Sequence, residues 1–146
     1  MRCYSKFTGL LAFTFVFTLS CSKKGEEKKE PQLSISGTIQ VKASLAKHTK
    51  DSDVIFLIAR AINEGPPVAV KRFAGKKYPY PFTIAQEDLM IAERKVQKPL
   101  NLTVRVDKDG DPMTKKPGDL TGTYERNPVS IHSENVVITI DRMLTE

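Results

Sequence analysis

Apolar and polar residues alternate from residue 33 onwards with the period of two that is typical of a half-buried β-strand. The first such segment carries its apolar side chains at Leu33, Ile35, Ile39 and Val41, with mainly polar residues between them. Gly37 takes one of the apolar positions. A glycine there indicates a bulge or the close approach of another backbone.

Residues 54–61 form the most apolar segment after the N-terminus. They are apolar on both faces and rich in β-formers, which predicts a central strand covered on both sides. Phe56, in the middle of this strand, is expected to fill the space between two sheets. Arg60 is expected to emerge near its end. Residues 65–67 predict a turn and residues 68–73 the antiparallel hairpin partner.

Further strand and turn signals follow. Alternation returns in residues 100–106, and residues 136–140 predict a strand near the C-terminus. Two prolines in residues 78–81 exclude a central strand there, because proline cannot donate to the ladder. Residues 44–47 predict a short helical turn, whereas residues 86–95 fit either a short helix or a crossing between sheets. About seven short strands separated by turns predict an all-β sandwich.

The first twenty residues have the layout of a signal peptide. Two basic residues, Arg2 and Lys6, precede the apolar run of residues 7–17. This run falls within the roughly 7–15 residues of a signal-peptide core. It is shorter than the roughly 18 apolar residues that a membrane-spanning helix needs. We therefore expect residues 1–20 to be removed.

Cys21 directly follows the small residue Ser20, which resembles the lipobox of bacterial lipoproteins. The match is relaxed, since Thr18 stands where the lipobox prefers leucine. We expect residues 1–20 to be a lipoprotein signal peptide and Cys21 to be lipidated. The alternative is an ordinary cleaved signal followed by a free thiol. Ser22, rather than Asp, after the cysteine is similar to lipoproteins kept in the outer membrane, facing the periplasm.

Residues 22–31 contain no apolar side chain and carry lysines and glutamates in short blocks. Such a segment cannot bury anything, so residues 21–32 are expected to be a lipidated, disordered tether before a domain at residues 33–146. Cys3 belongs to the segment that is removed. The folded part would then contain no cysteine, which excludes a disulfide, a cysteine-bound metal and a thiol nucleophile.

Composition narrows the class of protein further. The 146 residues are 40% hydrophobic and 27% charged, which suits one domain with one core. The net charge of +6 falls to +4 without Arg2 and Lys6, and tryptophan is absent. No clustered basic face or reader motif suggests a nucleic-acid partner. With two histidines, no catalytic triad can be singled out, and we expect no enzyme.

The sequence contains residue types that bind metal ions, but they do not occur at the spacing of a known metal-binding motif. Asp107, Asp109 and Asp111 alternate like the start of a calcium loop, but Pro112 stands where an EF-hand needs its glycine. The alternative is an Asp-Gly hairpin turn. Copper-ligand types occur at no recognisable motif spacing; they are His48, His132, Met90, Met113 and Met143. We therefore predict no metal and no cofactor.

Several segments together resemble one family, the C-terminal Ig-like domain of the cytochrome c-type biogenesis proteins CycH or CcmI. The most specific are the Phe-x-x-Ala-Arg-Ala strand end, Phe56 to Ala61, and the Pro-Gly-Asp-Leu-x-Gly turn, residues 117–122. The remaining similar segments are residues 37–41, 51–55, 66–72, 80–84, 104–106 and 138–141. The resemblance implies an Ig-like β-sandwich of about seven strands over residues 33–146.

In that family the domain follows transmembrane helices and a tetratricopeptide repeat region that captures apocytochrome c. This sequence shows neither, so the resemblance implies a stand-alone, non-catalytic lipoprotein module accessory to cytochrome c maturation. Apocytochrome c or haem-lyase components would be its partners. The alternative is an envelope lipoprotein that binds a small ligand or a metal ion. Neighbouring haem-lyase genes would favour the first hypothesis, and metal-efflux genes the second.

Three arginines are the candidate binding residues, because each ends or interrupts an apolar strand. They are Arg60, Arg72 and Arg105. A guanidinium that emerges from a sheet can clamp a carboxylate or a haem propionate. The alternative is that they pair with acidic residues on the sheet face or lie along it. Asp119, in the Pro-Gly-Asp turn, is expected to bond its own backbone.

Lipidation makes a direct prediction for Cys21→Ala. Each buried methylene contributes about 0.8 kcal/mol to membrane binding, so the acyl chains of a lipoprotein hold far more strongly than one chain. The variant should therefore move from the membrane fraction to the soluble fraction. A Cys21→Ala protein that is processed yet still sediments with membranes would show that lipid is not the anchor.

Overall fold

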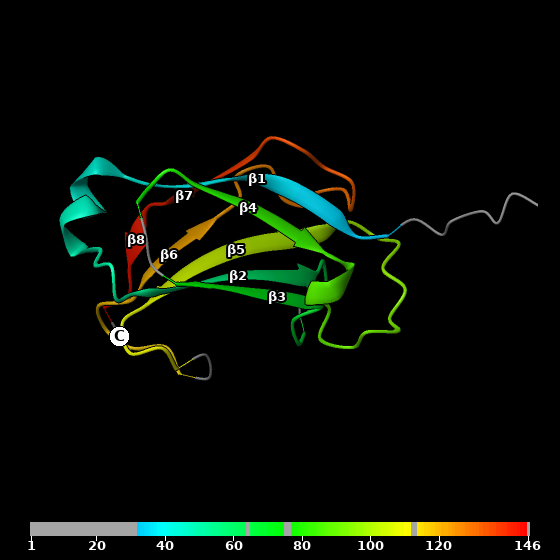
Figure 1. The fold of residues 1–146 in the computed structure, drawn as a ribbon, viewed down its shortest axis with the longest axis horizontal. Helices are drawn as coiled ribbons and strands as arrows, with labels where there is room; N and C mark the ends of the chain where they lie inside the picture. Colours follow the sequence, from blue (N-terminus) through cyan, green and yellow to red (C-terminus); the bar gives the residue numbers. More distant parts are fainter. Residues whose placement is uncertain (1–31, 64, 75–76, 112–113, 146) are drawn as a thin grey trace, which may run out of the picture.

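The computed structural model describes residues 32–145 except 64, 75–76 and 112–113. The predicted signal peptide, Cys21 and the tether up to residue 31 lie outside this part. Eight strands are arranged in two facing sheets (Figure 1). They are β1 (Ser34–Val41), β2 (Val54–Ala61), β3 (Ala69–Ala74), β4 (Tyr80–Ala85), β5 (Leu100–Asp107), β6 (Leu120–Thr123), β7 (Val136–Ile140) and β8 (Arg142–Met143).

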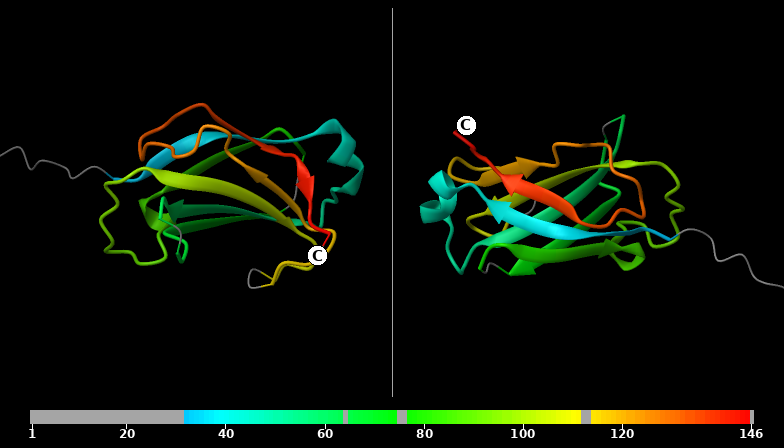
Figure 2. Two further views of the ribbon diagram at one scale, coloured as in Figure 1. Left: turned by 180° about the vertical axis from the view of Figure 1, so that it is seen from behind. Right: turned by 90° about the horizontal axis from the view of Figure 1, so that it is seen from above.

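One sheet has the strand order β4-β1-β7 and the other the order β3-β2-β5-β6-β8. Neighbouring strands are antiparallel except β1 and β7, which run parallel. Figure 2 shows the two sheets stacked as layers from two further directions. The predicted all-β sandwich is confirmed, with eight strands. The alternation in the sequence did not predict β6 or β8 individually.

Two short 3-10 helices complete the fold: η1 (Ala43–His48) and η2 (Gln86–Asp88). The first confirms the helical turn expected at residues 44–47. The second resolves the ambiguous segment as one turn followed by a loop, which bridges to β3 between Leu89 and Ala69. Neither helix in the described part of the chain has the length or hydropathy to cross a membrane.

β2 is the central strand that its sequence predicts. It lies between β3 and β5, and residues 68–73 supply most of its hairpin partner. Ile55, Leu57 and Ala59 face the other sheet and have no exposed surface. β4, which contains Pro81, lies at the edge of its sheet. A proline at an edge leaves no ladder donor missing inside the sheet.

The core fills the space between the sheets with alternate side chains from both. Its largest fully buried members are Leu33, Ile35, Ile39, Ile55, Leu57, Ile84, Leu100, Leu102, Leu120, Ile138, Ile140 and Val104. Burying one such aliphatic side chain contributes about 1.5–3 kcal/mol. The period-two pattern of β1, β5 and β7 therefore places one face of each strand in this core.

Two glycines allow backbones to approach closely around β7. A Cβ at Gly37 of β1 would lie 1.8 Å from the carbonyl oxygen of Val136. A Cβ at Gly122 of β6 would lie 2.1 Å from the carbonyl oxygen of Thr139. Gly37 thus marks the close approach that its place in the sequence indicates, and Gly122 lets the five-stranded sheet meet β7 of the other sheet.

Gly37→Ala should destabilise the domain by about 3 kcal/mol or more, because the added methyl group meets backbone atoms of β7 that cannot move alone. The measurement is the midpoint of denaturant unfolding. Ser34→Ala, at an exposed position of the same strand, is the matched control and should change the midpoint little. Equal midpoints for the two variants would contradict the register of β1 and β7.

Candidate binding face on the five-stranded sheet

The three candidate arginines all lie on one surface, the outer face of the five-stranded sheet, which points away from the core. In the strand register, Phe56 of β2 pairs with Arg72 of β3 on one side and Arg105 of β5 on the other. Side chains of paired residues point to the same face. Arg60 lies on this face as well, four residues further along β2.

Phe56 is buried, but not where the sequence analysis expected it. Its ring lies on the outer face, in register with Arg105, and is 4% exposed. The Arg105 guanidinium lies over the ring, with Cζ 5.4 Å from the ring centroid, in a cation–π contact. The expectation that Phe56 fills the space between the sheets is therefore wrong. Ile55 and Leu57 fill that space instead.

Arg105 does not emerge from the sheet. Its side chain is 7% exposed, and Nη2 lies 3.1 Å from Oδ2 of the fully buried Asp107. The same nitrogen donates to the backbone carbonyl of Asp111 at 3.1 Å. The guanidinium thus follows the alternative of pairing with an acidic residue. Its Nε has no hydrogen-bond partner among the described residues.

The aspartate at the end of β5 holds the start of the loop that follows it. Asp107 Oδ1 accepts hydrogen bonds from the backbone N–H groups of Asp109 and Gly110, at 3.2 and 2.6 Å. Gly110 has a φ of 78°, which suits the tight turn that glycine permits. The Asp107 carboxylate therefore holds a local turn at Asp109 and Gly110. Within residues 32–145, apart from the gaps, no group of three His, Cys, Asp or Glu side chains is placed to hold a metal.

Two of these carboxyls have shifted pKa values, in opposite directions. Burial, followed by the Asp109 side chain, raises the pKa of Asp107 above its ordinary value. The pKa of Asp109 is lowered to about 2, mainly by the hydrogen bond from the Lys116 ammonium. Burial and hydrogen bonding thus shift the pKa values of these two carboxyls in opposite directions, although the residues are only two positions apart.

The Asp119 side chain connects the two ends of the β5–β6 loop through hydrogen bonds. Its Oδ1 accepts from the backbone N–H of Lys108 at 3.2 Å, and its Oδ2 accepts from the backbone N–H of Lys116 at 3.1 Å. The side chain is 1% exposed. The expectation that Asp119 bonds the backbone of its own turn is confirmed.

Arg60 is the candidate with room for a ligand. It is half-buried and lines a cavity of about 530 Å³ on the outer face, together with Ala61, Gly65, Asn101, Thr103, Lys115, Thr123 and Asn127. Asn101 pairs with Arg60 in the strand register, and Thr103 pairs with Thr123. The lining residues include two cations, Arg60 and Lys115, and no acidic residue.

Lys115 could not be identified from the sequence, because it lies in the β5–β6 loop and follows no strand pattern. The cavity also gains hydroxyl groups from Thr103 and Thr123, while the Asn127 side chain is already bonded to the backbone of Leu102. Two cations beside hydroxyl groups favour an anionic ligand such as a carboxylate.

Arg72 remains at the surface. It is exposed on β3, beside Phe56 in the register, and lies outside the Arg60 cavity. The sheet therefore brings Arg72 and Arg105 to the two sides of one ring and leaves Arg60 apart from them. Of the three arginines, only Arg60 lines the cavity.

Of the residue types that could bind copper, His48 and His132 are both exposed, and Met113 lies outside the described residues.

Comparison with known proteins gives one family match. The family model described as the cytochrome c-type biogenesis protein H Ig-like domain matches residues 35–141. No curated protein matches the chain. A solved structure, described as an alternative pilotin from the type II secretion system of Vibrio cholerae, is 14% identical with a TM-score of 0.48. The alignment covers 77% of this chain and 99% of that one.

Arg105→Ala should destabilise the domain by about 3–5 kcal/mol, because it leaves the carboxylate of Asp107 buried without its partner. Denaturant unfolding at neutral pH measures the loss. Arg72→Ala is the matched control, since it removes the exposed arginine on the other side of Phe56 and should change stability by less than about 1 kcal/mol. Similar losses for both variants would contradict the burial of Arg105.

Proposed function

Because the chain belongs to the family of the cytochrome c-type biogenesis protein H Ig-like domain, we propose that it is a non-catalytic interaction module accessory to the maturation of c-type cytochromes. The family match over residues 35–141 supports the pathway. The outer face of the five-stranded sheet supports a role in binding, because it offers a cavity with unmatched positive charge.

The Arg60 cavity is the observation that carries this proposal. Within the described residues, neither Arg60 nor Lys115 makes an ion pair, whereas Arg105, Lys108 and Lys116 each have an acidic partner. A guanidinium can bind a carboxylate through two parallel hydrogen bonds, and a lysine beside it adds a point charge. The proposed partner group is a carboxylate on an apocytochrome or on a haem-lyase component.

A non-catalytic role agrees with how the acidic residues around the β5–β6 loop are used. Asp107 and Asp119 accept hydrogen bonds from backbone N–H groups, and Asp53 accepts one from the Lys108 ammonium at 2.6 Å. These carboxylates hold the β5–β6 loop in place. The chemistry available to a ligand in the Arg60 cavity is therefore donation of hydrogen bonds and positive charge.

We further propose that lipidated Cys21 anchors the domain to the outer membrane, facing the periplasm. The apolar run before Cys21 and the charged segment after it support this arrangement. A lipid anchor would keep the module close to membrane-bound maturation components, where a weak contact benefits from a high effective concentration.

The test combines deletion of the gene with complementation. The deletion should lower the yield of haem-stained c-type cytochromes, and the wild-type gene should restore it. Arg60→Ala combined with Lys115→Ala should restore only part, because losing a hydrogen bond to a charged group costs about 1.5–3 kcal/mol of binding. Lys47→Ala, at an exposed position of η1, is the control and should complement fully.

Denaturant midpoints equal to wild type are expected for the double variant, since both cations lie outside the core. Normal cytochrome levels in the deletion strain would contradict the proposed function. If the purified protein then held a metal tightly, the alternative of a metal-binding envelope lipoprotein would replace it.

A further inference from the structure

We propose that the end of the sandwich where β1 begins rests on the surface of an anionic phospholipid bilayer. This end comprises Ile62, residues 89–91 and residues 94–98, named here the basal end. The inference rests on the lipid anchor proposed at Cys21 and adds to it a second, non-covalent contact made by the folded domain.

The exposed apolar side chains gather at this end. Met90 and Ile91 are 61% and 62% exposed, and Ile62 is 47% exposed. The backbone N–H of Met90 donates to the carbonyl of Val68 at 3.0 Å, which joins the loop after η2 to the β2–β3 connection that contains Ile62. Of the described large hydrophobic residues, the only other one this exposed is Val137, which lies alone on β7.

The chain that leads from Cys21 enters the fold at the same place. The backbone N–H of Leu33 donates to the side-chain oxygen of Gln86 at 3.3 Å. The amide nitrogen of Gln86 in turn reaches the carbonyl of Arg94 at 3.5 Å. Gln32 and residues 92–97 also line one small cavity with Gln86. The basal end is therefore the part of the domain next to the tether.

The tether is too short to take the domain far from the bilayer. Cys21 to Pro31 is eleven residues, which span at most about 40 Å when fully extended. Even at this full extension the basal end is held near the surface at high effective concentration. Weak contacts suffice under that condition.

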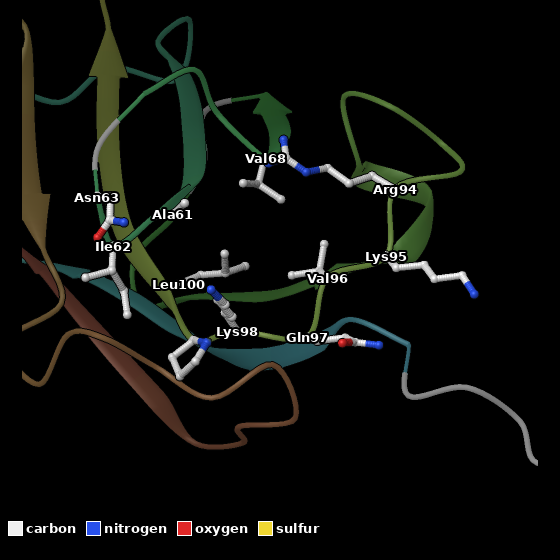
Figure 3. Close-up of a pocket in the computed structure, with 11 residues that line it drawn as sticks. Ala61, Ile62, Asn63, Val68, Arg94, Lys95, Val96, Gln97, Lys98 and Leu100 are labelled. Carbon is white, nitrogen blue, oxygen red and sulfur yellow. The ribbon is translucent and has the colours of Figure 1, made fainter.

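The charge of the basal end suits an anionic surface. Residues 92–100 contain three cations, Arg94, Lys95 and Lys98, and one acid, Glu93. Arg94 and Lys98 line a cavity of about 460 Å³ whose apolar wall includes Val68, Val96 and Leu100. Figure 3 shows these three apolar side chains facing the cavity and Lys95 pointing away from it.

Exposed apolar side chains beside cations are the combination that binds at a lipid interface. The apolar groups enter the boundary between headgroups and acyl chains, and the cations attract anionic headgroups. Met90 and Ile91 would enter the interface, with Arg94 and Lys98 against the phosphates. The Arg60 cavity lies next to this end, since Ala61 lines both cavities.

The absence of tryptophan from the sequence allows a direct test. The full-length lipoprotein carrying Ile91→Trp is reconstituted into vesicles of phosphatidylethanolamine and phosphatidylglycerol with brominated acyl chains. Its fluorescence should be quenched several-fold more than that of Val137→Trp, the matched control on β7. Adding Arg94→Glu and Lys98→Glu to Ile91→Trp should lower the quenching in these vesicles.

Sedimentation of the same vesicles distinguishes the hypothesis of a lipid anchor at Cys21 from the hypothesis that the basal end contacts the bilayer. If both tryptophan variants sediment with the vesicles but are quenched equally, the contact of the basal end is wrong and the anchor stands. If the processed protein does not sediment, the anchor fails and the contact fails with it. The yield of c-type cytochromes is a separate measurement, so neither result depends on the proposed role in maturation.

Discussion

The burial of Arg105 between Phe56 and Asp107 is the interaction on which the outer face of the five-stranded sheet depends. It covers an aromatic ring that a bare sheet face would leave in water, and its bond to the Asp111 carbonyl draws the β5–β6 loop onto the sheet. Asp119 then closes the other end of that loop. Lys115 reaches the Arg60 cavity because the loop is held at both ends.

This arrangement is costly in free energy, since two charges leave water and Nε of Arg105 has no partner among the described residues. A hydrophobic pair of similar volume could fill the same space without that cost. A hydrophobic pair could not position the loop. Arg105 can, because its guanidinium donates a hydrogen bond to the backbone carbonyl of Asp111. We therefore regard Arg105 as a positioning residue for the proposed binding face, because its guanidinium is buried against Phe56 and Asp107.

The sequence predicts the sandwich well and its outer face poorly, for a physical reason. Half-buried strands such as β1 and β5 show which side is buried through their alternation. β2 is apolar on both sides, so its pattern cannot tell whether Phe56 or Ile55 faces the other sheet. What covers Phe56 is Arg105 on β5, about fifty residues later, which no local pattern records.

The same limit explains the missed strands and the missed cation. β6 has four residues with glycine and two threonines, and β8 has two residues, too few for a period to appear. Arg60 could be proposed because it ends an apolar strand. Lys115 could not, since its place beside Arg60 is set by the Asp119 and Arg105 contacts and not by its neighbours in the sequence.

The parallel pairing of β1 with β7 also determines when the domain can fold. β1 is the inner strand of its sheet, and its partners are residues 80–85 and 136–140. Such long-range contacts slow folding, because a long loop must close before they form. During synthesis the first strand has no complete sheet to join until almost the whole chain has emerged. The three-stranded sheet is therefore complete only once β7 has been made, and truncating the chain before β7 removes the support of its first strand.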